Sequence, residues 1–364
     1  MSDSGEPLLK KRKVEKQSTP LKECCKEITE GTLFGLGNPL LDISTSVTKD
    51  FLDKYDLEVD NAILAEDKHK PIYNEIVQKF DVHYTPGGAT QNSLRIAQWI
   101  LGKPNMATFF GCVGKDEFGK TLLNKAKASG LNVNYDENDT EATGTCAVLI
   151  TDNHRSLCAN LAAANYYTNK HLDKNWDQVQ KANFFYSAGY HLTVNPEAML
   201  KIAQYSNGEK KTYCFNLSAP FISHVFKEPL MKLLPYVDYL FGNETEAREF
   251  SKQQNYGTEH LKEIIKKISE EKKISKKTRV VIITQGSEPT LIYKDGEVKE
   301  YPVIPIREDD IVDTNGAGDA FVGGFLSQLV QRKDIEQCVK CANYTANYCI
   351  RQFGTSINDM ADFK

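Results

Sequence analysis

Short apolar segments alternate with amphipathic helical segments through most of the chain, beginning at residue 32. Residues 32–37 and 106–113 each predict a strand, and apolar residues at helical spacing lie between them in 94–101. Further strands are predicted at 183–188, 212–217, 237–241 and 280–284. Repeated strand–helix units predict an α/β fold, in which helices cover both faces of a doubly wound, mostly parallel sheet. Ligands of such folds bind at the carboxyl ends of the strands.

Two insertions, residues 40–86 and 142–162, interrupt this alternation. They contain short β-like stretches without regular crossover helices between them, at 62–64, 145–150 and 157–161. We expect these stretches to pair into a small sheet above the strand ends, where it would act as a lid. The predicted domains are therefore this small lid domain and a large α/β domain formed by residues 31–39, 87–141 and 163–364.

Composition narrows the range of partners. The 364 residues are 40% apolar and 26% charged, with a net charge of −4. A mildly acidic chain lacks the positive field of a nucleic-acid binder. No apolar run approaches the roughly 20 residues that span a bilayer. We therefore expect neither nucleic acid nor a membrane as a partner.

The N-terminal residues 1–30 are polar and predict a disordered tail. The basic run at 10–14 is typical of a nuclear import signal, although it also fits a solvated charge run. Nine cysteines without a signal peptide indicate a reducing compartment. The expected location is the cytoplasm, and also the nucleus if the basic run is a working signal. Cys338 and Cys341 favour helical packing over a zinc site, because no second pair accompanies them.

The segment 313–325 carries the most specific chemistry. Gly316 and Gly318 precede residues with helical spacing, so their backbone N–H groups lie at a helix N-terminus, which favours an anion such as phosphate. Asp319, in the first turn, can accept a proton from a hydroxyl held against that phosphate. The plainer alternative is a glycine turn followed by a helix-start aspartate. No Gly-Lys-Ser or Gly-Lys-Thr follows, which excludes a Walker loop.

This segment resembles the signature of the ribokinase-like family of carbohydrate and nucleoside kinases. Seven further motifs agree with that family in order along the chain, at residues 37–42, 86–92, 111–119, 143–146, 155–165, 216–221 and 241–246. The resemblance implies a ribokinase-like sheet with a small β-sheet lid, in a protein that is usually a monomer. It also implies transfer of the ATP γ-phosphate to the 5′-hydroxyl of adenosine. A sugar kinase of the same fold, a nucleoside-binding protein without turnover and a nucleic-acid-associated factor remain alternatives.

The resemblance assigns catalytic roles to five residues. Asp319 would be the general base, and the amides of Gly316, Ala317 and Gly318 would form the anion hole for the transferred phosphoryl group. Arg155 matches a lid arginine suited to neutralising phosphate oxygens.

The resemblance also implies the nucleoside contacts. Asn38 and Asp42 match positions that hold ribose hydroxyls, and Gly87 and Gly88 match a di-glycine switch. Asn92 would reach the sugar, unless it is only a helix-start amide. An apolar pocket for adenine is expected from side chains that would serve equally as plain core, namely Leu40, Ile63, Leu64, Cys146, Leu157, Ala159, Leu161 and Phe221.

Asn243 and Glu246 match a family element that organises Mg²⁺ and the phosphates, with Glu246 acting through water. A helix cap followed by a first-turn acid is the alternative for this pair. The ATP side is expected to include Thr284, Gly286, Asn315 and Asn343. Three residues depart from the family pattern, namely Ala89 and His191 on the substrate side and Glu308, where relatives have a Gln.

Overall fold

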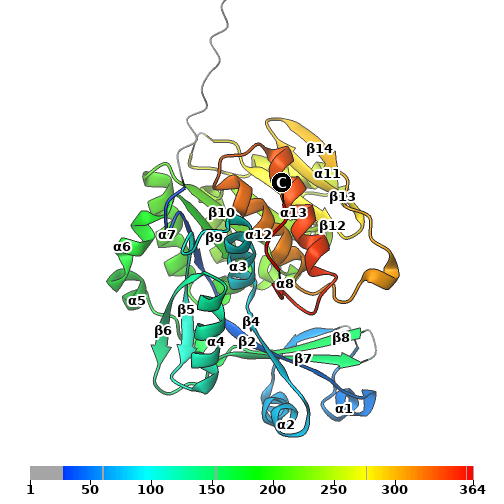
Figure 1. Cartoon of the computed structure of the whole chain (residues 1–364). Coiled ribbons are helices and arrows are strands. Elements are labelled where there is room, and N and C mark those ends of the chain that lie inside the picture. Colours follow the sequence, from blue (N-terminus) through cyan, green and yellow to red (C-terminus); the bar gives the residue numbers. More distant parts are fainter. Residues whose placement is uncertain (1–27, 60, 152–153, 276, 358, 364) are drawn as a thin grey trace, which may run out of the picture.

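A nine-stranded sheet forms the centre of the molecule (Figure 1). The computed structural model describes residues 28–59, 61–151, 154–275, 277–357 and 359–363, so the basic run at 10–14 and nearly all of the predicted tail lie outside the described residues. The strand order is β14-β13-β12-β11-β10-β9-β1-β5-β6. The strands are β1 (Leu33–Leu36), β5 (Ala107–Gly114), β6 (Asn132–Asn138), β9 (Phe184–Ala188), β10 (Thr212–Asn216), β11 (Tyr239–Asn243), β12 (Val280–Gln285), β13 (Glu288–Lys294) and β14 (Glu297–Tyr301).

The strands from β12 to β6 are all parallel, and only β13 and β14 pair antiparallel at one edge. This confirms the predicted mostly parallel sheet. Alternate side chains of a strand point to opposite faces. Phe34 accordingly packs into one core and its neighbour Leu33 into the other.

Helices cover both faces of this sheet, as predicted. One face carries α3 (Ala89–Leu101), α4 (Glu117–Ala128), α12 (Ala317–Leu329) and α13 (Ile335–Cys349). The opposite face carries α5 (Asn169–Lys174), α6 (Trp176–Lys181), α7 (Pro196–Gly208), α8 (Pro220–Val225), α9 (Lys227–Leu233), α10 (Glu244–Gln253) and α11 (Leu261–Glu270). Short 3₁₀ turns are η1 (Asp67–His69), η2 (Ala162–Tyr166), η3 (Gly189–Thr193), η4 (Leu234–Tyr236) and η5 (Glu308–Asp310).

A second sheet of five strands projects from one end of the large sheet (Figure 1). Its order is β3-β8-β7-β2-β4, with β2 (Leu40–Ser46), β3 (Ala62–Leu64), β4 (His83–Gly87), β7 (Thr145–Thr151) and β8 (His154–Asn160). The expectation of no regular helices here was wrong. Helices α1 (Lys49–Lys54) and α2 (Pro71–Lys79) follow β2 and β3, because their apolar side chains cover one face of the sheet.

The opposite face of this small sheet is apolar and has no helix on it in the described residues. Leu40, Cys146 and Val148 form its buried part, and the chain passes into it directly from the carboxyl end of β1. The apolar face therefore lies over the strand ends, where an α/β fold binds its ligands.

The described residues show the state of the cysteines and allow a search for metal clusters and membrane-spanning helices. The seven cysteines in the described residues are buried free thiols, and Cys338 and Cys341 pack inside α13 as predicted. No three His, Cys, Asp or Glu side chains gather as a metal cluster in this part of the chain. None of the described helices has the length and apolarity needed to cross a membrane.

Candidate active site

A cavity of about 1570 Å³ lies between the small sheet and the carboxyl ends of the large sheet. Its walls come from segments far apart in the sequence, from Asn38 after β1 to Ile350 after α13. Most of the residues proposed from the sequence line it. The arrangement places an apolar wall and a helix N-terminus around one space.

The N-terminus of α12 opens into this cavity. Gly316, at the N-cap, has a φ of 77°, which is a left-handed conformation that favours glycine. A Cβ at Gly316 would also meet the Thr355 Cγ2 at 2.5 Å, whereas one at Gly318 would meet nothing within 4 Å. The first N–H groups of a helix have no acceptor within the helix. The N–H of Asn315 donates to the Asp313 Oδ1, and the N–H of Ala317 donates to the Thr314 carbonyl at 3.2 Å. Gly316 and Gly318 therefore offer the donors for an anion on the cavity side.

Asp319 lies in the first turn of α12, beside these donors. Its Oδ2 accepts a hydrogen bond of 3.0 Å from the Nδ2 of Asn92 in α3. Removal from bulk water raises the pKa of Asp319 to about 7, although the Asn92 bond opposes that rise. A carboxylate that titrates near neutral pH is well matched to proton abstraction from a hydroxyl.

Asp42 is a second carboxylate at the same end of the cavity. Desolvation, followed by the negative charge of Asp319, raises the pKa of Asp42 to about 7, and the nearby Arg95 opposes this. Gly87 lies beneath Asp42 rather than in the cavity wall. A Cβ at Gly87 would come within 2.1 Å of the Asp42 Oδ1, so glycine is required for this carboxylate to occupy its place.

Asn38 and His191 form a buried polar pair in the cavity wall. The Asn38 Nδ2 donates to the Tyr190 carbonyl at 3.2 Å, which turns the Asn38 Oδ1 toward the His191 Nδ1, 2.6 Å away. Burial lowers the pKa of His191 to about 3, so the imidazole is neutral. An amide oxygen can only accept, and the Nδ1 of His191 therefore carries the proton.

The apolar wall comes mainly from the small sheet. Side chains on its open face contact one another and leave their other side toward the cavity. Leu64 at the rim is 57% exposed. The lining residues of this wall are Leu40, Ile63, Leu64, Cys146, Leu157, Ala159 and Leu161, with Phe221 from α8. Gly88, Ala89 and Asn92 at the start of α3 line the cavity next to them.

Asn243 and Glu246 lie where β11 passes into α10, and both line the cavity. They form a reciprocal cap, because the Asn243 Oδ1 accepts from the Glu246 backbone N–H at 2.9 Å and the Glu246 Oε2 accepts from the Asn243 N–H at 3.0 Å. Desolvation raises the pKa of Glu246 to about 7. The capping alternative is thus realised, and it leaves a buried carboxylate at the cavity wall. Thr284, Gly286, Asn315 and Asn343 line the same region.

Comparison with known proteins shows the family to which this chain belongs. Residues 49–361 match the model of the pfkB family of carbohydrate kinases. The chain belongs to the pfkB carbohydrate kinase family. The resemblance drawn from the motifs is confirmed.

Relatives of this pfkB family member are similar over nearly their whole length. Adenosine kinase 2 of Arabidopsis thaliana is 49% identical over 337 residues, which cover 92% of this chain and 98% of the relative. The structure of Anopheles gambiae adenosine kinase in complex with P1,P4-di(adenosine-5) tetraphosphate is 51% identical with a TM-score of 0.84, covering 88% of this chain and 96% of that one. Adenosine kinase from Schistosoma mansoni in complex with 2-fluoroadenosine is 35% identical with a TM-score of 0.86, covering 92% and 99%.

Arg155 of this pfkB family chain does not line the cavity. Its guanidinium pairs with Asp313 at 3.0 Å, and the side chains of both residues are buried. The role of Arg155 at the phosphates therefore stays a prediction, because in this conformation its charge faces the loop before α12. Gly87 is the other proposed residue that the cavity wall does not include.

Sequence reasoning missed one stretch of the cavity wall. Residues 302–306, Pro-Val-Ile-Pro-Ile, line the cavity near α13 together with Ile311 and Ile350. The signal was present as an apolar run between two prolines, directly after an edge strand. The run has neither helical nor strand periodicity, so the pattern of apolar positions predicts no element there. Tyr190, which also lines the cavity, was missed as well.

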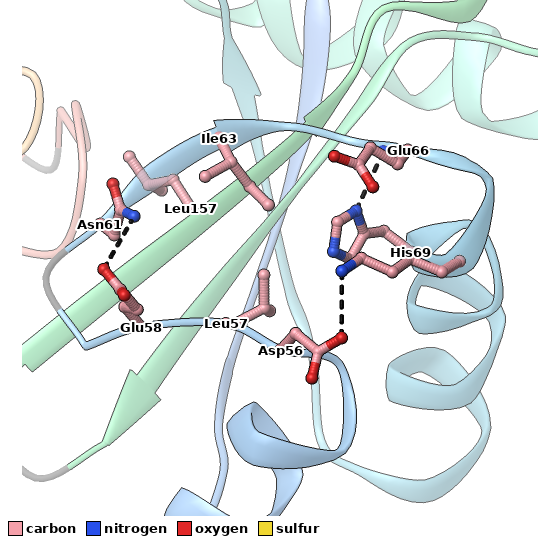
Figure 2. Close-up of a pocket in the computed structure, with 9 residues that line it drawn as sticks. Asp56, Leu57, Glu58, Asn61, Ile63, Glu66, His69 and Leu157 are labelled. Carbon is pink, nitrogen blue, oxygen red and sulfur yellow. Dashed lines mark hydrogen bonds and ion pairs between the residues drawn. The ribbon is translucent and has the colours of Figure 1, made fainter.

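A smaller cavity of about 260 Å³ lies in the five-stranded sheet region and shares Ile63 and Leu157 with the large one (Figure 2). Its polar side chains have partners. His69 accepts from the Glu66 backbone N–H at 2.9 Å, and Lys68 pairs with Asp56 at 3.0 Å. The chemistry of the molecule therefore centres on the large cavity, which holds the carboxylates of raised pKa and the open helix N-terminus.

Proposed function

We propose that this chain transfers the γ-phosphate of ATP to the 5′-hydroxyl of adenosine, giving AMP and ADP, and so acts as an adenosine kinase in purine salvage. The observation that carries this proposal is the position of Asp319. It lies beside the open N-terminus of α12, in one cavity with an apolar wall. An anion site, a base and a surface for a purine are the three parts that the reaction requires.

The nucleoside is expected beneath the small sheet. The apolar side chains of that wall would contact the purine faces, which have a large π surface. Asn38 and Asp42 would hold the ribose hydroxyls, since an amide and a carboxylate can bond vicinal hydroxyls together. The 5′-hydroxyl would then point toward Asp319.

In the reaction, Asp319 takes the proton of the 5′-hydroxyl as the oxygen forms a bond to the γ-phosphorus. The bond from that phosphorus to the bridging oxygen breaks, and ADP leaves with the electron pair. Phosphoryl transfer proceeds through a loose transition state, so positioning and charge stabilisation supply most of the catalysis. The N–H groups of Gly316 and Gly318 would stabilise the negative charge on the phosphoryl oxygens, whereas the N–H of Ala317 already donates to the Thr314 carbonyl.

We also propose that Mg²⁺ accompanies ATP. Mg²⁺ keeps water and phosphate oxygens as most of its ligands, so few protein ligands are expected. Glu246 is buried in the cavity wall and fits an outer position, with Asn243 fixing its orientation. When bound, Mg²⁺ would neutralise charge on the ATP phosphates.

The small sheet is proposed to act as a lid. Residues 40–86 and 142–162 would form it, and the large domain would comprise residues 31–39, 87–141 and 163–364. Its exposed apolar rim, with Leu64 as the extreme case, gives closure over a purine a hydrophobic gain. Protease sensitivity of residues 40–86 should fall when adenosine binds, and unchanged sensitivity would speak against closure.

One assay separates this function from its alternatives. The protein is incubated with Mg-ATP and adenosine, guanosine, inosine, ribose or fructose, beside Asp319→Asn. Adenosine should be the preferred acceptor, and the variant should lose about 10²–10⁴-fold in kcat. Preference for ribose or fructose would overturn the substrate. Tight adenosine binding with no product would indicate a nucleoside-binding protein instead. Undiminished turnover by the variant would remove Asp319 as the base.

We further propose a monomer of the cytoplasm and nucleus that binds neither nucleic acid nor membranes. The acidic net charge of −4 supports the absence of nucleic-acid binding, and the basic run at 10–14 supports nuclear import. Sedimentation should give the mass of a single chain. Deletion of residues 10–14 from a fluorescent fusion should remove it from the nucleus, and unchanged nuclear signal would exclude this run as the signal.

A further inference from the structure

Thr355, near the C-terminus, does not line the cavity but contacts two residues that do, Asn92 and Gly316. It is 4% exposed and lies on a segment that follows α13. Its Oγ1 lies 2.9 Å from the Asn92 Oδ1 and 3.3 Å from the Arg95 Nη1, and its methyl group lies against Gly316. One side chain thus contacts the partner of Asp319 and the glycine at the helix start.

The Thr355 hydroxyl accepts one hydrogen bond and donates another. A guanidinium can only donate, so the Thr355 hydroxyl accepts from Arg95. It donates its single proton to the Asn92 Oδ1 at 2.9 Å. With its oxygen occupied in this way, the Asn92 amide turns its Nδ2 toward the Asp319 Oδ2, at 3.0 Å.

We propose that Thr355 is a positioning residue for phosphoryl transfer, which holds the Asn92 amide with its N–H on one oxygen of Asp319. This inference rests on the proposed function, because it names a residue that prepares the base for that reaction. The inverted amide would place the Asn92 oxygen against the carboxylate, where two acceptors repel each other. Thr355 disfavours that arrangement, because its hydroxyl proton would lose the Asn92 Oδ1 as acceptor. The observed arrangement leaves the other oxygen of Asp319 available for the substrate hydroxyl.

The orientation of Asn92 bears on the ionisation of the base. A hydrogen bond donated to a carboxylate favours its charged form, and the Asn92 bond lowers the pKa of Asp319 against the effect of desolvation. Other charged groups lie near the neighbouring Asp42. The negative charges of Asp319 and Asp313 raise the pKa of Asp42, the positive charge of Arg95 lowers it, and Glu246 lines the same cavity. Without Thr355, Asp319 would hold its proton more tightly and a smaller fraction would act as base.

The test compares Thr355→Val, which keeps the shape and removes the hydroxyl, with Thr355→Ser, which keeps the hydroxyl. Thr355→Val should lower kcat about tenfold, leave the KM for ATP unchanged and move the acid limb of the kcat–pH profile to higher pH. Thr355→Ser should restore both kcat and the acid limb. Ser356→Ala is the matched control, because the Ser356 hydroxyl bonds only the neighbouring Phe353 carbonyl in the described contacts.

A double-mutant cycle with Asn92→Ala decides whether Thr355 acts through Asn92. Thr355→Val should have little further effect on kcat in the Asn92→Ala background, and additive losses would overturn the proposal. A wild-type acid limb and kcat in Thr355→Val would overturn it too. If Thr355→Val does not fold, Thr355→Ala takes its place in the cycle. If the wild-type protein does not phosphorylate adenosine, the proposed function itself is refuted. That outcome is distinct from a failure of the Thr355 proposal.

Discussion

Arg155 in β8 and Asp313 in the loop before α12 form a buried ion pair of 3.0 Å, with side-chain exposures of 8% and 1%. Asp313 also accepts the backbone N–H groups of Asn315 at 2.9 Å and Gly354 at 2.7 Å. The small sheet, the loop that carries the anion site and the C-terminal segment therefore meet at one carboxylate. An ion pair of this kind is costly to break from one side only, because a charge is left buried.

The first prediction concerns this pair. Arg155→Met and Asp313→Asn should each lower the free energy of unfolding by about 3–5 kcal/mol, and the double variant should lose clearly less than the sum. Urea denaturation of the four proteins measures the coupling. If Arg155 instead serves the phosphates, Arg155→Met should raise the KM for ATP at nearly unchanged stability, which would contradict the structural role.

The second prediction is the pH dependence of activity. The pKa values of Asp319 and Asp42 both lie near 7, and Asp319 must be ionised to accept a proton. Activity should therefore fall as the pH decreases through about 7. The two carboxyls are coupled, so the apparent values belong to the pair. Measurement of kcat/KM from pH 5 to 9 checks this, and a profile that stays flat down to pH 5 would contradict it.

The third prediction concerns the effect of the Asp319 carboxyl on the pH dependence of folding stability. The folded state raises the pKa of Asp319 from 3.8 to about 7. Between these values the folded chain keeps a proton that the unfolded chain has lost, so stability falls as pH rises. Asp319→Asn should therefore gain stability over the wild type from pH 4 to 7, by at most about 1.4 kcal/mol per pH unit, with a constant difference above pH 7.

Urea denaturation at several pH values tests this sign. Asp295→Asn is the control, since Asp295 lies at an exposed turn and does not line the cavity. Parallel curves for Asp319→Asn and the wild type would mean that the Asp319 carboxyl titrates alike in the folded and unfolded chains.

The fourth prediction separates two glycines that lie two residues apart. Gly316→Ala forces an alanine into a φ of 77° and places its Cβ 2.5 Å from the Thr355 Cγ2, so it should lose about 1–3 kcal/mol of stability and most activity. Gly318→Ala meets nothing within 4 Å in the protein. Its stability should stay within about 0.5 kcal/mol of the wild type, while the KM for ATP rises because the methyl enters the anion site. Equal destabilisation of both variants would contradict this difference.

The parts of the fold that repeat locally were predictable. Strands such as β1 and β12 are short apolar runs with clear boundaries, and their alternation with helices dictates parallel pairing. The residues of the anion site were predictable for a related reason, since Gly316, Gly318 and Asp319 are neighbours in sequence. Their chemistry depends on a local conformation, which a short segment specifies.

What the sequence could not indicate depends on contacts between distant segments. Thr355 and Asn92 are 263 residues apart. Arg155 belongs to the predicted lid domain, and its partner Asp313 belongs to the predicted large domain. No periodicity encodes such pairs. Helices α1 and α2 were missed because they are short, with only six and nine residues. Such short amphipathic segments are stabilised by the sheet on which they pack, which their own sequence does not specify.

The fifth prediction concerns His191, whose Nδ1–H donates to the Asn38 Oδ1 and whose Nε2 has no hydrogen-bond partner within the described residues. His191→Phe keeps an aromatic ring against Tyr167, 5.6 Å between ring centroids in the wild type, but releases the Asn38 amide. If Asn38 holds a ribose hydroxyl, the KM for adenosine should rise several-fold, by about the 0.5–1.5 kcal/mol of one hydrogen bond. The KM for a deoxyadenosine lacking that hydroxyl should change little. An equal rise for both nucleosides would show that His191 acts by stacking alone, without orienting Asn38.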